Sequence, residues 1–267
     1  MLVEGRHFLP GADPRALGHK ALAVNLSDLA AMGAAPRWAM LALSLPAADE
    51  AWLAAFAAGF FALAERYGVE LVGGDTTRAS LLAISITAIG EVPSGVALYR
   101  AGARAGDDLW VSGELGGAAL ALVHPEIAEA AQRLHRPEPR VELGERLRGQ
   151  ARAAIDVSDG LAGDLQHILE RSGVGATVHY ADIPRAAAFE EVRNPELEQQ
   201  CVLSGGDDYE LLFTASPAAR ASVIEAAAAA GVQVTLIGAI EAGSGVGVVG
   251  PDGRRLDGFE RGGWSHF

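Results

Sequence analysis

Helix and strand patterns alternate through the first third of the chain, and this alternation limits the fold more than any other feature. Helical spacing of apolar residues predicts helices over residues 13–32 and 50–67, the second closed by Gly68. Short apolar or alternating stretches predict strands over residues 37–45, 69–72 and 82–89, the first two buried. Such segments in this order favour a sheet with helices packed against it.

The periodic pattern is lost between Glu91 and Gly106, where prolines and glycines interrupt it. We place a domain boundary here, with one domain over residues 1–103 and an α/β domain over residues 104–267. In the second domain, strands are predicted over residues 107–112, 176–180, 209–214 and 232–237. Helices are predicted over residues 117–123, 125–134, 141–148, 161–171 and 217–230. The predicted fold class is α+β with an α/β-like alternation, in two domains.

Composition and charge exclude several classes of protein. Half of the 267 residues are hydrophobic and 21% are charged, so the chain can bury a sizeable core. A formal net charge of −13 opposes binding to nucleic acid or an anionic membrane, although Mg²⁺ can bridge carboxylates and nucleotide phosphates. Cys201 is the only cysteine, which excludes an intramolecular disulfide and a cysteine-based zinc site. No membrane-spanning run or secretion signal is found, so we expect a cytoplasmic protein.

Acidic residues lie in four turns that are rich in glycine or other small residues. The turns cover residues 25–28, 73–78, 156–160 and 205–210. A carboxylate beside a glycine is a hard oxygen ligand on backbone that can approach a small anion closely. The repetition of this feature predicts a site for Mg²⁺ and phosphate.

Three of these turns also have interpretations that need no ligand. Asp28 can be a solvated helix residue, although the surrounding helix is apolar on most sides. Asp75 can form an Asx turn with the threonines that follow it. The three acids within residues 205–210 can form an ordinary surface turn, although like charges so close together repel unless a cation, a proton or water relieves them.

The turn at residues 156–160 precedes a predicted helix. Ser158 or Asp159 is expected to cap that helix, which leaves Asp156 without a structural explanation. A helix N-terminus also favours phosphate, which suits Ser158 as a phosphate contact. Asp164, one turn further along, is expected to be a solvated surface residue.

Several well-known motifs are absent or weak. Residues 245–250 match the dinucleotide glycine pattern, but turn residues follow them, so we interpret the segment as a strand that leads into a hairpin. The chain has no P-loop, no protein-kinase motifs, no nucleophile elbow and no histidine spacing typical of zinc sites. The chain is therefore neither a P-loop protein nor a protein kinase by these motifs.

Six segments spread over nearly the whole chain resemble the thiamine-monophosphate kinase family. They are residues 2–8, 20–33, 73–78, 156–160, 204–211 and 263–267. The family is set apart from its relatives by a Val-Glu-Gly-x-His-Phe start and a His-Phe end. The resemblance implies the two-domain architecture of the superfamily named for aminoimidazole ribonucleotide synthetase, with mixed sheets flanked by helices.

The resemblance also implies a reaction and a set of site residues. The reaction is ATP-dependent phosphorylation of thiamine monophosphate to thiamine diphosphate, with Mg²⁺ as cofactor. Catalytic roles are implied for Asp28, Asp75 and Asp156, and Mg²⁺ binding for these three and Asp159. The implied ATP contacts are Gly74, Asp75, Arg100 and Ser158. The implied substrate contacts are His7, Asp207 and Trp264, although the family usually has glutamate at the position of Asp207.

A homodimer is implied as well, with N-terminal domains that bind nucleotide and metal and pair through their sheets. The family begins further upstream, with a strand, a Gly-Asp-Asp motif and a Thr-Thr-Asp or Ser-Thr-Asp stretch that supply further Mg²⁺ ligands. Met1 falls just after that stretch, so we expect part of the metal site and of the dimer sheet to be missing. The alternatives are another ATP-using enzyme of the superfamily, a non-catalytic protein that binds nucleotide or thiamine phosphate, and an acidic protein without a site.

Overall fold

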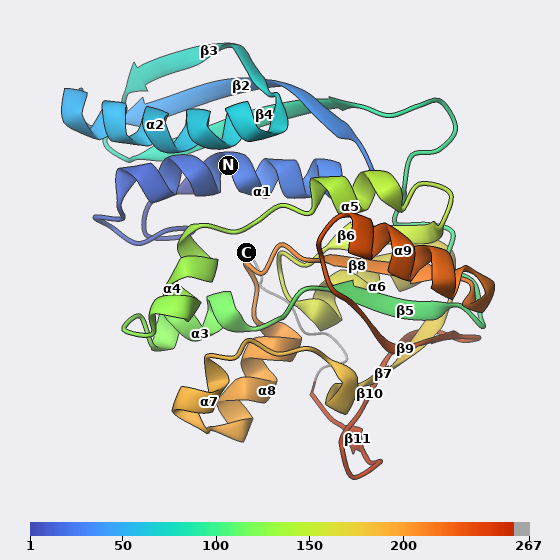
Figure 1. Cartoon of the computed structure of the whole chain (residues 1–267). Coiled ribbons are helices and arrows are strands. Elements are labelled where there is room, and N and C mark those ends of the chain that lie inside the picture. Colours follow the sequence, from blue (N-terminus) through green and yellow to red (C-terminus); the bar gives the residue numbers. More distant parts are fainter. Residues whose placement is uncertain (259–267) are drawn as a thin grey trace.

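Two mixed sheets form the framework of the protein in the computed structural model, which describes residues 1–258 (Figure 1). The strands of the first sheet are β1 (Leu2–Val3), β2 (Ala35–Leu45), β3 (Glu70–Arg78) and β4 (Ala83–Glu91). Those of the second are β5 (Asp108–Ser112), β6 (Ala151–Asp156), β7 (Gly175–His179), β8 (Leu211–Ala215), β9 (Val234–Glu241), β10 (Gly245–Val249) and β11 (Arg255–Leu256). Their orders are β1-β4-β2-β3 and β11-β10-β7-β9-β5-β8-β6. The predicted α+β class is confirmed.

Helices α1 (Pro14–Ala31) and α2 (Glu50–Tyr67) pack against each other and against the first sheet. Their predicted ends are confirmed: the Asp13 and Asp49 side chains accept N–H groups of the first turns, and Gly68 closes α2 at φ 65°. The two helices approach closely where a Cβ on Gly59 would lie 1.8 Å from the Arg15 carbonyl oxygen. Glycine at this crossing therefore sets how near α2 can come to α1.

The first sheet corrects the predictions for two strands. Strand β2 was expected to be buried, but its residues alternate, with Ala39 and Leu43 in the core and Met40 exposed. Strand β3 was also expected to be buried, but its residues are exposed except for Leu71, which is half-buried. It runs beyond the predicted 69–72 and pairs with β2 in parallel, so Gly73, Gly74 and Asp75 lie in an edge strand and not in a turn. The reason is that the β2–α2–β3 connection returns the chain beside β2, where its backbone finds ladder partners.

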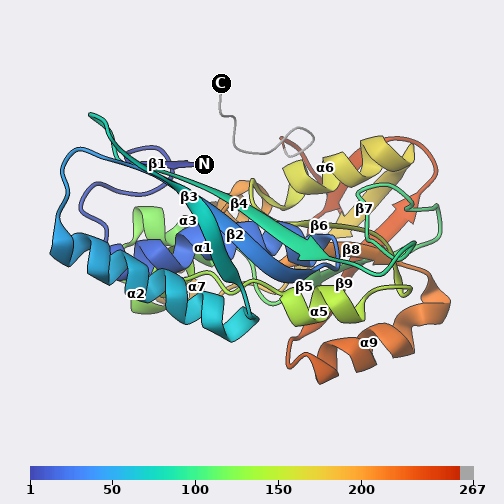
Figure 2. The ribbon, with the colours of Figure 1, turned by 90° about the horizontal axis from the view of Figure 1, so that it is seen from above.

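Helices cover both faces of the second sheet (Figure 2). Trp110 and Phe213 point toward α5 (Val141–Arg146) and α9 (Arg220–Ala229), whereas Leu109 and Val111 belong to a core with α6 (Leu161–Ser172). The remaining helices are α3 (Gly117–Val123), α4 (Ala128–His135), α7 (Phe189–Val192), α8 (Pro195–Ser204), η1 (Tyr180–Asp182) and η2 (Pro217–Ala219). The predicted hairpin is confirmed as β10 and β11, but β6, α7 and α8 were not predicted.

The linker between the sheets passes between α1 and β6. The Leu98 N–H donates to the Met32 carbonyl, and the Ala154 N–H donates to the Tyr99 carbonyl. The core of the first sheet also includes Phe213 and other residues of the second. The domain division at residue 103 stays a prediction. Within residues 1–258, no helix is both long and apolar enough to cross a membrane.

Candidate functional site

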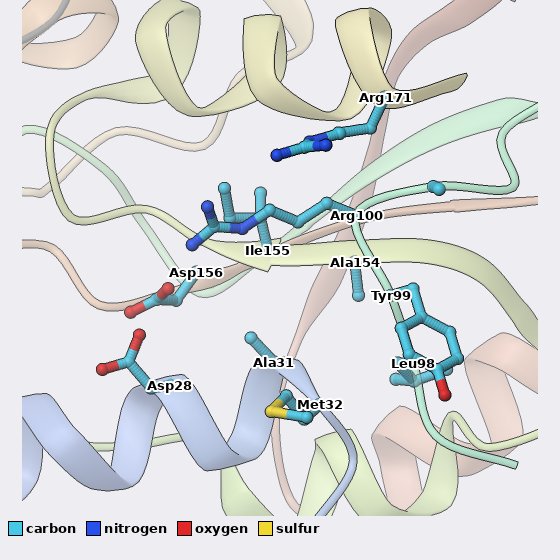
Figure 3. A pocket seen from close by; sticks show the side chains of 11 residues that line it. Asp28, Ala31, Met32, Leu98, Tyr99, Arg100, Ala154, Ile155, Asp156 and Arg171 are labelled. Carbon is cyan, nitrogen blue, oxygen red and sulfur yellow. The ribbon is translucent and has the colours of Figure 1, made fainter. Parts of the chain in front are cut away.

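A pocket of about 430 Å³ opens where α1, the linker, β6 and α6 meet (Figure 3). Its charged lining consists of Asp28 from α1, Arg100 from the linker, Asp156 from β6 and Arg171 from α6. Its walls are otherwise apolar, with residues such as Met32 and Leu98. A concave, mostly apolar pocket with a few converging charges is the usual form of a small-molecule site.

The acidic end of the pocket pairs Asp28 with Asp156 (Figure 3). Asp156 is 4% exposed and accepts a hydrogen bond from the Ser27 hydroxyl at 2.7 Å. Burial, followed by the charge of Asp28, raises the pKa of Asp156 to about 6. Asp28 is an exposed residue, yet desolvation by the pocket walls raises its pKa against the charge of Arg100. A cation between the two carboxylates would relieve their repulsion.

The basic side of the pocket carries Arg100 and Arg171, whose side chains extend in the same direction in Figure 3. Within residues 1–258 neither guanidinium takes part in an ion pair, although the charge of Arg100 offsets part of the rise in the pKa of both aspartates. A guanidinium offers several N–H donors to phosphate oxygens. The pocket therefore combines a candidate cation site with a candidate phosphate site.

The turn after β6 is held by Asp164, which the sequence led us to place on the surface. That prediction is wrong, because Asp164 is 2% exposed and its Oδ2 accepts the N–H groups of Ser158 and Asp159 at 2.9 and 3.0 Å. Burial raises its pKa to about 7. The predicted cap by Ser158 or Asp159 is also wrong, because α6 has Gly160 at its N-cap without a side-chain hydrogen bond.

The acidic segment 205–210 is not a simple surface turn, because each carboxylate has its own partner. Asp207 is paired with Lys20, Glu210 with Arg140, and Asp208 accepts the Gly116 N–H. Each of the three acidic side chains therefore has a partner within the protein. The segment also lies directly against the turn after β6, because a Cβ on Gly206 would lie 2.4 Å from the Ser158 carbonyl oxygen.

The structure does not bring all the predicted aspartates into the pocket. Asp75 and Gly74 are exposed on β3 and do not line it. Gly74 has φ 147°, and a Cβ there would lie 1.8 Å from the Leu41 carbonyl oxygen, so close packing of two strands accounts for this glycine. Within residues 1–258, no group of three or more His, Cys, Asp or Glu residues is arranged to hold a metal ion. The pair that meets is Asp28 and Asp156.

Of the predicted substrate contacts, His7 and Asp207 lie in different parts of the described structure. His7 accepts the Val3 N–H through Nδ1 at 3.1 Å, in the turn that follows β1. Asp207 lies beside the turn after β6, with its side chain 31% exposed. Trp264 lies outside the described residues. The roles of all predicted site residues stay predictions.

Sequence reasoning missed three residues around the site: Lys20, Asp164 and Arg171. Helical spacing could have identified Lys20. It lies seven residues before Ser27 and eight before Asp28, so the three side chains share one face of α1. The other two gave no local signal, because Asp164 and Arg171 look like ordinary polar residues of an amphipathic helix. Their place beside the site depends on where α6 packs.

Two family models together match most of the chain. Residues 1–92 match the model of the AIR synthase related protein N-terminal domain, and residues 104–250 match that of the C-terminal domain. The chain is thus an AIR synthase-related protein. Thiamine-monophosphate kinase of Salmonella typhimurium is 45% identical over 90% of this chain and 77% of that protein. The chain belongs to the thiamine-monophosphate kinase family, as the sequence resemblance predicted.

Solved structures agree with this assignment. The crystal structure of thiamine-monophosphate kinase from Stenotrophomonas maltophilia has a TM-score of 0.89 and 47% identity, and the match covers 96% of this chain and 84% of that one. A structure of AaThiL complexed with AMPPCP and TMP has a TM-score of 0.87 and 33% identity, with 100% of this chain and 85% of that one covered.

Proposed function

We propose that this protein transfers the terminal phosphoryl group of ATP to thiamine monophosphate, which yields thiamine diphosphate and ADP. The observation that carries this proposal is the similarity, over the whole chain, to a kinase structure that holds AMPPCP and TMP together. AMPPCP is an ATP analogue, and TMP abbreviates thiamine monophosphate. The pocket with Asp28 and Asp156 opposite Arg100 supplies charges of the kind that this reaction needs.

The chemical difficulty of the reaction is charge and not proton transfer. The accepting phosphate oxygen of thiamine monophosphate is ionised at neutral pH, so the protein needs no strong general base. Two polyanions must instead be brought into line, and catalysis then consists of positioning and electrostatic stabilisation. Acidic residues alone would repel both substrates, so the site requires cations.

Asp28 and Asp156 fit the role of Mg²⁺ ligands, because two desolvated carboxylates that repel each other are stabilised by a cation held between them. When bound, Mg²⁺ would neutralise phosphate charge as the phosphoryl group moves. Asp159 and Asp75 are proposed as further ligands on the sequence resemblance alone. Ser27 keeps the Asp156 carboxylate in place through its hydroxyl.

The nucleotide and the acceptor are proposed to contact opposite sides of the pair Asp28 and Asp156. Arg100, which faces this pair across the pocket, is assigned to the ATP phosphates. Ser158 and Gly74 are assigned to ATP on the sequence resemblance alone. Asp207 is assigned to thiamine monophosphate because its partly exposed carboxylate lies beside the turn after β6. The sequence resemblance adds His7 and Trp264 to the acceptor side.

A homodimer and a cytoplasmic location complete the proposal. The face of the first sheet turned away from α1 and α2 exposes Trp38, Met40 and Ile89, and Trp38 lies opposite Ile89 in the β2–β4 pairing. An exposed apolar sheet face is the kind of surface that a second copy would cover. The N-terminal domain would then serve both metal binding and dimerisation.

The test of the proposed function is an assay of the purified chain with ATP, Mg²⁺ and thiamine monophosphate, in which thiamine diphosphate and ADP are measured. We expect both products in equal amounts, and neither when Mg²⁺ is chelated. The matched variant Asp156→Asn keeps the shape of the side chain and removes its charge, and should lower turnover by about 10²-fold or more.

Two results would point to the alternatives. Calorimetric binding of AMPPCP and thiamine monophosphate without ADP release from ATP would indicate a non-catalytic binding protein. ADP release that does not depend on thiamine monophosphate would indicate an ATP-using enzyme with another acceptor.

A further inference from the structure

A buried lysine lies next to the residue assigned to the substrate. The Lys20 ammonium donates a hydrogen bond to Asp207 Oδ2 at 2.9 Å, and the Lys20 side chain is 4% exposed. The Tyr209 hydroxyl donates to Asp207 Oδ1 at 2.8 Å. Both oxygens of this carboxylate are therefore held from the protein side, while 31% of the side chain stays accessible.

The backbone around Asp207 has an uncommon conformation. Asp207 and Tyr209 have φ values of 69° and 53°, in the left-handed region that non-glycine residues rarely occupy. Such strain persists where surrounding contacts impose it, and it often marks functional segments. Here the Asp207 N–H donates to the Ser158 carbonyl, and the Tyr209 N–H donates to the Val157 carbonyl. The loop that carries Asp207 is thus tied to the turn after β6.

Helix α1 reaches both of these segments with one face. Lys20 contacts Asp207, and Ser27, two turns later, contacts Asp156. Asp28 follows Ser27 and lines the pocket. One rigid helix therefore fixes the carboxylate of Asp207 relative to the pair Asp28 and Asp156.

Stability alone does not account for a lysine in this place. The desolvation of a buried ammonium offsets most of what its ion pair contributes, and an apolar side chain of similar size often stabilises a protein as well. A buried cation that meets a partly accessible carboxylate has a different effect, because it fixes the direction in which the free lone pairs of that carboxylate point.

We propose that Lys20 and Tyr209 are positioning residues, which orient the Asp207 carboxylate for contact with thiamine monophosphate. The inference rests on the proposed function, because it deepens the role assigned there to Asp207. The cationic thiazolium and the amino group of the pyrimidine give thiamine monophosphate the groups that a fixed carboxylate can attract or accept from. Lys20 itself touches Asp207 and acts through it.

The test compares the affinities of the wild type and Lys20→Met for thiamine monophosphate and, separately, for AMPPCP by calorimetry. Methionine keeps an unbranched apolar stem and removes the ammonium. We expect the Kd for thiamine monophosphate to rise roughly tenfold or more, since a displaced binding group loses its geometry. The Kd for AMPPCP should stay within about twofold, because Arg100 and Asp156 are untouched. Lys20→Arg keeps a cationic donor and should recover most of the lost affinity.

A double-mutant cycle separates action through Asp207 from an independent effect. Asp207→Asn alone should weaken thiamine monophosphate binding, and adding Lys20→Met should then change the Kd little, because no carboxylate remains to be oriented. Tyr209→Phe removes one hydroxyl and should weaken binding in the same direction. This variant keeps the test decisive if Lys20→Met does not fold.

Three results would overturn the inference: unchanged affinity for thiamine monophosphate in Lys20→Met and Tyr209→Phe, an equal loss of affinity for both ligands, or additive effects in the cycle. Turnover measured in parallel keeps the proposed function distinct. A wild type that binds thiamine monophosphate without phosphorylating it contradicts the kinase proposal, while the affinities still decide the role of Lys20. A wild type that does not bind it contradicts both.

Discussion

At the scale of single residues, the acidic side chains of this protein differ mainly in the groups that surround them. Asp156 lies at the pocket beside Asp28, where a cation would be favourable. Asp164 instead accepts two backbone N–H groups and holds the shape of the turn after β6. Asp208 accepts the N–H of Gly116 just before α3. The same residue type thus lines the pocket in one place and accepts backbone N–H groups in the others.

Asp164 provides a test of this division of roles. Asp164→Ala should lower the free energy of unfolding by about 1–3 kcal/mol, because it leaves two N–H groups of a largely enclosed turn without an acceptor. Asp164→Asn retains an acceptor oxygen and should cost less. Urea denaturation measures both, with the exposed Asp182→Ala as control. Equal stability of Asp164→Ala and the control would contradict the role given to Asp164.

Asp208 gives a prediction for pH dependence. Desolvation raises its pKa to about 8 in the folded protein, above the value of about 3.9 expected when unfolded. The folded state therefore binds the proton more tightly, and the stability from this group is full below about pH 4 and lost as the pH rises through about 8. Asp208→Asn cannot lose a proton, so it should gain stability relative to wild type between pH 5 and pH 9. Urea unfolding of both proteins at pH 5 and pH 9 measures this difference. If the difference in stability between Asp208→Asn and wild type is the same at both pH values, Asp208 is ionised in the folded protein.

At the scale of elements, α1 links the two halves of the protein. It packs on α2 and on the first sheet, and it presents Lys20, Ser27 and Asp28 to the second half. The close approach of α2 at Gly59 keeps α1 in position, because there is no room for a side chain at the crossing. The geometry of the site therefore depends on a helix contact remote from the pocket.

Gly59→Ala tests this dependence. The added Cβ would meet the Arg15 carbonyl oxygen at 1.8 Å, so α2 must shift, and we expect a loss of about 1–3 kcal/mol in the free energy of unfolding. The effect should appear despite the higher helix propensity of alanine. Gly247→Ala in β10 is the matched control, because its nearest contact would be an ordinary 3.6 Å. If both variants unfold at the same denaturant concentration, the helices are not packed as described.

At the scale of the whole molecule, the two halves share one core, and one sheet face is left uncovered. The core around α1 includes Trp110 and Phe213 of the second sheet, so the halves are packed together by apolar contacts. Trp38, Met40 and Ile89 remain exposed on the outer face of the first sheet. This face is where the proposed homodimer would form.

Met40→Glu tests the proposed dimer. A charge in the middle of this apolar face should shift the protein from dimer to monomer in sedimentation at micromolar concentration, because burying an unpaired carboxylate is costly. Leu122→Glu, at an exposed apolar residue of α3, is the control and should leave the mass unchanged. A wild type that sediments as a monomer would rule out dimerisation through this face under these conditions.

The sequence by itself determined the elements whose signals are local. Helical spacing of apolar residues predicted α1 and α2, and Gly68 marked the end of α2. Turn residues after Gly250 predicted the hairpin of β10 and β11. It also predicted the family, because the matching segments are distributed over the whole chain. Each of these signals can be recognised in the sequence because it consists of residues within a few positions of one another.

The tertiary structure alone decided which residues meet. Asp28 and Asp156 are far apart in the chain, and they line the same pocket because α1 packs against β6. The burial of Asp164 and the pairing of Lys20 with Asp207 depend on the same packing. Gly73 to Asp75 became an edge strand because β2 offered ladder partners that no local pattern reveals. Burial and pairing are properties of the assembled core, and a sequence read residue by residue does not contain them.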